Sequence, residues 1–171
     1  MPAVQMAGLA CDCWRSSPDP ALTGCGCVPA IATHALSSEA GSVRAARDFT
    51  LAALRRKGTA HSSQDVAVVV SELVTNALLH ALPADTGPRG PIRLGLLQHG
   101  RWLLCAVADP GKAVPVPRTP GALAEAGRGL QMVCALSDGW GYTTPSDAGK
   151  VVWAMFAAPP VLNRGQICPA R

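Results

Sequence analysis

The strongest pattern in the sequence is a long apolar segment, Val66–Leu82, that three evenly spaced polar residues interrupt. The segment contains no glycine or proline, so nothing breaks a helix before Pro83. The polar residues are Glu72, Asn76 and His80. Helical residues four positions apart lie nearly above one another, so the pattern predicts a carboxylate, an amide and an imidazole on one narrow stripe.

The predicted stripe has two interpretations. A polar strip on an apolar helix can simply face solvent and carry no chemistry. This strip, however, is narrow and extends to no Lys or Arg, and burying it unpaired would be costly. An amide oxygen, a base and a donor also suit a hydrated divalent metal and phosphate. The pattern therefore favours a helix that turns its polar stripe toward a polar ligand and buries its apolar positions, Val69, Val70, Leu73, Val74, Ala77 and Leu78.

The pattern before this helix predicts a short edge strand at residues 30–36 and a helix that ends near Lys57. Ser37 or Ser38 is the expected N-cap of that first helix, with Glu39 in its first turn, and Gly58 is placed to end it. For the central helix, Ser62 or Ser63 is the expected cap, and Asp65 lies near its positive end.

The pattern after the central helix predicts two hairpins separated by a short helix. Strands are expected at residues 92–98 and 102–108, and again at 140–143 and 151–156. The short helix is expected at residues 130–136, after a Pro-, Ala- and Gly-rich stretch, residues 112–126, that reads as a mobile loop. The predicted fold class is α+β: a two-layer sandwich with helices on one face of a mixed, mainly antiparallel sheet.

Composition and charge place this fold in a single globular domain. The chain has 171 residues, 49% of them apolar and 15% charged, with a net charge of +4. The basic residues are scattered apart from Arg55–Lys57, which suits a helix C-terminus better than nucleic-acid binding. We find neither a membrane-spanning run nor a secretory signal, and expect a soluble, cytoplasmic protein that binds no membrane. The expected domain covers residues 30–158, between tails at 1–29 and 159–171.

The N-terminal tail carries its own candidate chemistry. Two Cys-x-Cys pairs, eleven residues apart, could supply four thiolates to zinc: Cys11, Cys13, Cys25 and Cys27. The alternative is a flexible tail with incidental thiols. Cys105 and Cys134 fall in apolar segments and are expected to behave as small hydrophobic residues.

Three motifs in order carry a family resemblance. The segment Glu72–His80 resembles the N-box of the gyrase and histidine-kinase type (GHKL, Bergerat fold) ATPase superfamily. Asp109-Pro110-Gly111 is similar to its first glycine box, and Gly127-Arg128-Gly129-Leu130 to its second. The sequences of two segments, Ser71–Ala77 and Gly149–Trp153, are most similar to those of bacterial anti-sigma-factor serine/threonine kinases.

The resemblance implies a role for each motif residue. Asn76 would offer its amide oxygen to Mg²⁺, and Glu72 would be the catalytic general base or would position a metal-bound water. His80 would reach the phosphates or ribose, or only pack. Asp109 would accept a hydrogen bond from the exocyclic amine of adenine, and Gly111 would let the backbone approach the adenine base. The second box would hold phosphate through Gly127, Arg128, Gly129 and Leu130.

The resemblance also implies an activity, cofactors and partners. The expected cofactors are ATP and Mg²⁺, with transfer of the γ-phosphate to a serine or threonine of a protein antagonist and control of a sigma factor. A homodimer is plausible, and the loop at 112–126 would close over nucleotide. The chain departs from the family at Ala113, where many members have glycine, and at Val151, where many have an adenine-binding threonine. The alternatives are a non-catalytic ATP-dependent protein-binding module and a metal or thiol sensor.

Overall fold

The computed structural model describes residues 30–37, 41–80, 91–111, 113, 115, 128–144 and 149–159. Eight elements follow one another along these residues: β1 (Ala30–Leu36), α3 (Ser42–Lys57), α4 (Ser63–His80), β2 (Ile92–His99), β3 (Trp102–Asp109), α5 (Gly129–Leu136), β4 (Gly139–Thr143) and β5 (Lys150–Ala157).

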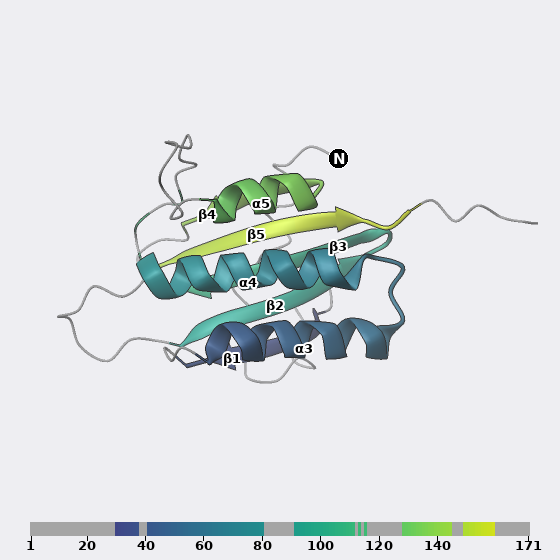
Figure 1. Ribbon diagram of the computed structural model, residues 1–171, viewed down its shortest axis with the longest axis horizontal. Helices are drawn as coiled ribbons and strands as arrows, with labels where there is room; N and C mark the ends of the chain where they lie inside the picture. Colours follow the sequence, from purple (N-terminus) through teal and green to yellow (C-terminus); the bar gives the residue numbers. More distant parts are fainter. Residues whose placement is uncertain are drawn as a thin grey trace, which may run out of the picture.

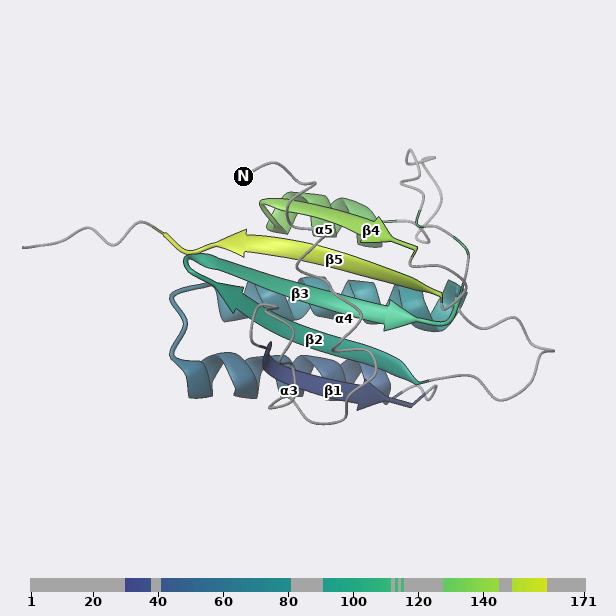
Figure 2. The same ribbon diagram turned by 180° about the vertical axis from the view of Figure 1, so that it is seen from behind.

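The five strands form one sheet in the order β1-β2-β3-β5-β4, and all four pairings between them are antiparallel. The three described helices lie side by side on one face of this sheet (Figure 1). Figure 2 shows the opposite face, where the strands stand in front of the helices. The predicted α+β sandwich is therefore confirmed, with a sheet that is antiparallel at every described pairing rather than mixed.

The two faces of the sheet carry separate apolar clusters because successive side chains of a strand point to opposite sides. On the helix side, Leu103, Cys105 and Val107 of β3 join the core beneath the helices. On the other side, Leu104, Ala106 and Ala108 form a second buried cluster with Val151 and Trp153 of β5. This alternation decides which side of the sheet each residue near the strand ends faces.

Most predicted element ends agree with the structure. Gly58 ends α3 in the left-handed conformation (φ 64°), and its N–H donates to the carbonyl of Leu54 over 3.0 Å. Ser62 Oγ accepts a hydrogen bond from the Asp65 N–H over 3.3 Å, as expected of a cap. The strand at residues 30–36 does lie at a sheet edge.

The predicted start of the first helix is wrong. The helix begins at Ser42 with Gly41 as N-cap, and no side chain of the described residues caps it by a hydrogen bond. Ser37 lies just after β1, and its backbone carbonyl accepts a hydrogen bond from Ser42 Oγ over 2.6 Å. The serine that local sequence marks as a cap therefore connects the end of β1 to the first residue of the helix.

The two central cysteines differ from each other. Cys105 is fully buried, and burial raises the pKa of its thiol from 9.0 to about 12, so it behaves as the predicted small hydrophobic residue. The prediction is wrong for Cys134, which lies on the exposed side of α5, where its Sγ accepts a hydrogen bond from Trp140 Nε1 over 2.8 Å.

Candidate functional site

The central helix α4 presents two of the three residues of its predicted polar stripe, Glu72 and Asn76, on one side. Val69, Val70 and Val74 are completely buried against the sheet, whereas Glu72 and Asn76 are only partly buried. The i, i+4 spacing places their carboxylate and amide groups on one side of the helix. His80 is the last residue of α4, and its side chain lies outside the described structure.

The start of α5 lies directly against this stripe. A Cβ atom built on Gly129 would stand 2.6 Å from Glu72 Oε2 and 3.8 Å from Asn76 Nδ2. Only a glycine therefore lets the first turn of α5 come this close to the carboxylate without displacing it. The N-terminal N–H groups of a helix lack intrahelical partners and carry partial positive charge, so the structure puts anion-binding groups beside Glu72 and Asn76.

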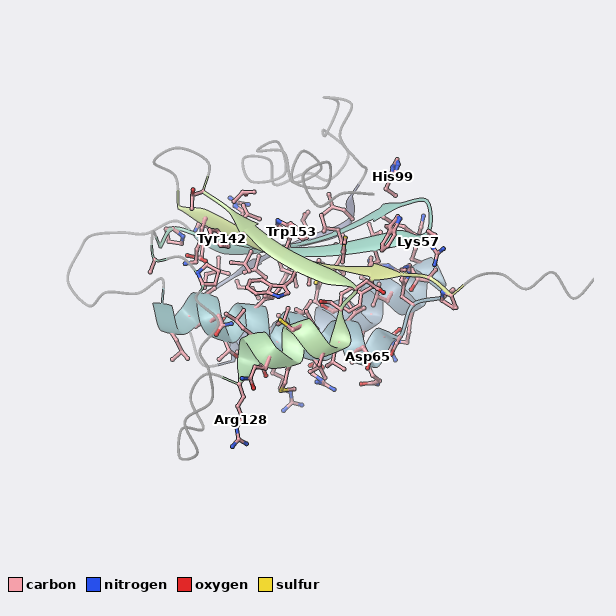
Figure 3. All side chains as sticks on the ribbon, turned by 90° about the horizontal axis from the view of Figure 1, so that it is seen from above. Lys57, Asp65, His99, Arg128, Tyr142 and Trp153 are labelled. Carbon is pink, nitrogen blue, oxygen red and sulfur yellow. The ribbon has the colours of Figure 1, made fainter. Side chains whose placement is uncertain are left out.

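Of the other residues of the second glycine box, the structure describes Arg128 and Leu130. Arg128 is the N-cap of α5, and its exposed side chain points away from the sheet (Figure 3). Leu130 is buried, so it anchors this end of α5. Gly127 lies outside the described residues.

The first glycine box forms a compact turn at the end of β3. Asp109 is almost completely buried, with 2% of its surface exposed. Its Oδ1 accepts hydrogen bonds from the Gly111 N–H over 2.8 Å and from Lys150 Nζ over 2.9 Å. The end of β3, the start of β5 and the C-terminal half of α4 lie at the same end of the molecule (Figures 1 and 2). All three predicted motifs therefore meet at one end of the sheet.

The residue that β5 presents to Asp109 is Lys150, not the residue at position 151. Val151 belongs to the apolar cluster on the opposite face of the sheet. Lys150 is the register partner of Asp109 across the two strands. Sequence comparison alone missed this lysine, although counting alternate residues back from the helix-facing Val152 would have placed it on the same face.

The comparison with known families agrees with this arrangement. The model of the histidine kinase-like ATPase domain matches residues 36–156, most of the chain and all three motifs. The chain belongs to the histidine kinase-like ATPase family. No curated protein matches the chain. The family assignment makes this an ATP-binding domain.

The residues present fit Mg²⁺ and a nucleotide phosphate. Among the described residues, Asn76 Nδ2 is a buried atom with no hydrogen-bond partner, and it points toward Gly129. A buried amide that lacks a partner is costly unless another group satisfies it. Rotating the amide by half a turn about its terminal bond puts the oxygen in the same place, and an amide oxygen is a kind of ligand that Mg²⁺ accepts.

Several predicted features fall outside the described residues. The Cys-x-Cys pairs at Cys11, Cys13, Cys25 and Cys27 do so, as does most of the loop at 112–126. Within the described ranges, no cluster of three or more His, Cys, Asp or Glu side chains could hold a metal ion. In the same ranges, no helix is both long and apolar enough to cross a membrane.

The tight contact at Gly129 leads to a specific prediction. In Gly129→Ala, the new methyl group would overlap the carboxylate at the end of the flexible Glu72 side chain and lie at ordinary contact distance from Asn76, so Glu72 should rotate away while the fold persists. We expect the melting temperature to change by no more than about 3 °C. ATP turnover should fall at least about tenfold, because a catalytic group that is displaced by about an ångström loses much of its effect. An unchanged turnover rate would show that ATP turnover does not depend on the position of the Glu72 carboxylate.

Proposed function

We propose that this ATP-binding domain is a protein serine/threonine kinase of the anti-sigma-factor type. It transfers the γ-phosphate of Mg·ATP to a serine or threonine of a protein antagonist and so controls the availability of a sigma factor. The observation that carries this proposal is the close approach of Gly129, at the N-terminus of α5, to the side chains of Glu72 and Asn76. It brings together a carboxylate, an amide and the free N–H groups of a helix N-terminus, which are the kinds of group that this transfer requires.

Each side chain has one task in this reaction. Asn76 holds Mg²⁺ by its amide oxygen, and the first N–H groups of α5 bind phosphate oxygens. Glu72 lies one turn before Asn76 and accepts the proton of the attacking hydroxyl group. Phosphoryl transfer depends mainly on positioning and on neutralising charge, so these few groups are sufficient.

Base recognition is assigned to Asp109. Its carboxylate accepts a hydrogen bond from the 6-amino group of adenine, whereas guanine carries a carbonyl oxygen, an acceptor, at that position and would be repelled. The buried position of Asp109 supports this role, because water competes poorly for a buried carboxylate.

The variant Asp109→Asn tests base recognition. It keeps the shape of the side chain but removes its charge and adds a donor group that can meet guanine. We expect the ratio of GTP to ATP dissociation constants to fall at least about tenfold, the usual worth of a hydrogen bond to a charged group. Titration calorimetry with each nucleotide and Mg²⁺ measures it. Asp65→Asn, in the first turn of α4 and away from Arg128 (Figure 3), is the control and should keep the wild-type ratio.

The kinase activity itself is tested with γ-labelled Mg·ATP. The purified chain is incubated with candidate antagonist proteins from the same cell, and label on serine or threonine is measured. Binding to purified sigma factors is measured with and without ATP, and the oligomeric state is determined in parallel to test the homodimer. ATP-dependent sigma-factor binding without any label transfer would favour the non-catalytic binding module instead.

A further inference from the structure

We propose that Lys150 is a positioning residue of the nucleotide site, which fixes the orientation in which Asp109 reads the 6-amino group of adenine. This inference rests on the proposed role of Asp109. The family resemblance gives no role to a lysine here, and the inference comes from the contacts between the first residue of β5 and the last residue of β3.

The two side chains form a buried ion pair. Lys150 Nζ lies 2.9 Å from Asp109 Oδ1, and the side chains are only 4% and 1% exposed. The residues are directly opposite in the β3–β5 register, so the backbone ladder itself brings them together. At this burial, neither charged group can exchange its partner for bulk water.

The contacts fix the carboxylate group rather than merely neutralising it. The Gly111 N–H and Lys150 Nζ both donate to the same oxygen, Oδ1. Lys150 Nζ also lies 3.5 Å from the Gly111 carbonyl oxygen, so it joins the turn after β3 to β5. The carboxylate cannot rotate about its Cβ–Cγ bond without giving up two charge-assisted contacts. Its plane is therefore set before a nucleotide arrives.

Stability alone does not account for this pair. Burying two charges costs several kcal/mol in desolvation, and well-packed apolar residues of similar size are often equally stable in such positions. A preorganised carboxylate, in contrast, avoids the entropy loss of ordering that side chain when a ligand binds. The geometry thus fits a role in nucleotide recognition better than a role in folding.

The test compares ATP with purine riboside triphosphate, which lacks only the 6-amino group. Wild-type protein should bind ATP at least about tenfold more tightly, as expected for a hydrogen bond to a carboxylate. In Lys150→Met this ratio should fall below about threefold, because the carboxylate is no longer held in place. A purely structural role would weaken both nucleotides equally and leave the ratio unchanged, which would overturn the inference.

Two further variants complete the experiment. Lys57→Met removes the same charge from the exposed end of α3, away from Arg128 (Figure 3), and should keep the wild-type ratio. The double variant Asp109→Asn/Lys150→Met leaves no unpaired buried charge and should bind ATP within about threefold of Asp109→Asn alone, because residues in contact act non-additively. A double variant that binds ATP clearly more weakly than Asp109→Asn would contradict the inference, and this comparison does not require Lys150→Met to fold.

The outcomes separate this inference from the function on which it rests. If wild-type protein binds ATP no better than purine riboside triphosphate, the role of Asp109 fails, and the role of Lys150 fails with it. If wild-type protein does discriminate and Lys150→Met discriminates equally well, only the role of Lys150 is wrong.

Discussion

Replacing Glu72 by glutamine should lower phosphate transfer at least about a hundredfold, the usual contribution of a general base. Glutamine has nearly the same size and can still contact the first turn of α5, but it cannot accept a proton. In the proposed mechanism Glu72 contacts neither the adenine ring nor the bound phosphates. The ATP dissociation constant should therefore stay within about threefold of wild type. Single-turnover transfer of γ-label and calorimetric binding give the two values.

The matched control for this prediction is Asp48→Asn. Asp48 lies on α3, its side chain is 67% exposed, and its contact with Arg44 is a 3.8 Å surface ion pair of small energetic value. Transfer should be unchanged in this variant. A Glu72→Gln protein that binds ATP and still transfers phosphate at the wild-type rate would rule out Glu72 as the base and leave it only the positioning of water.

The largest loss of stability is expected for Gly149→Ala. Gly149 has a φ of 96°, which alanine adopts only with strain. A Cβ there would also overlap the Asp109 carbonyl oxygen and stand 2.7 Å from Pro110 Cα, both rigid backbone atoms. Strain of this kind costs about 1–3 kcal/mol before the overlap is counted, so the melting temperature should fall by at least about 5 °C.

The Gly149→Ala substitution should also weaken ATP binding. Moving Gly149 away from Pro110 displaces Lys150 from Asp109, so ATP affinity should fall together with stability, even at temperatures where the protein is folded. Gly41→Ala is the control: Gly41 has a φ of −70°, and nothing lies within 4 Å of a Cβ built on it. That variant should be as stable as wild type or slightly more stable. A Gly149→Ala protein with wild-type melting and ATP binding would contradict the close approach of these strands.

The sequence determined the elements that local patterns specify. An apolar segment without glycine or proline defines α4, and the i, i+4 spacing of Glu72 and Asn76 defines its polar stripe, because the helical period alone sets which residues share a face. Gly58 and Ser62 fix their helix ends through contacts with residues only a few positions away. The three motifs in order also pointed to the family that matches residues 36–156.

The tertiary structure decided what depends on strand pairing and on the approach of distant segments. Glu72 meets Gly129, and Asp109 meets Lys150, at sequence separations of 57 and 41 positions respectively. Register determines that Lys150 rather than Val151 faces the site, and a shift of one residue would exchange the two. Strand alternation puts Lys150 on the same face as Val152, but only the packing of the sheet shows that this face meets the helices, and only the pairing of β3 with β5 puts Lys150 opposite Asp109.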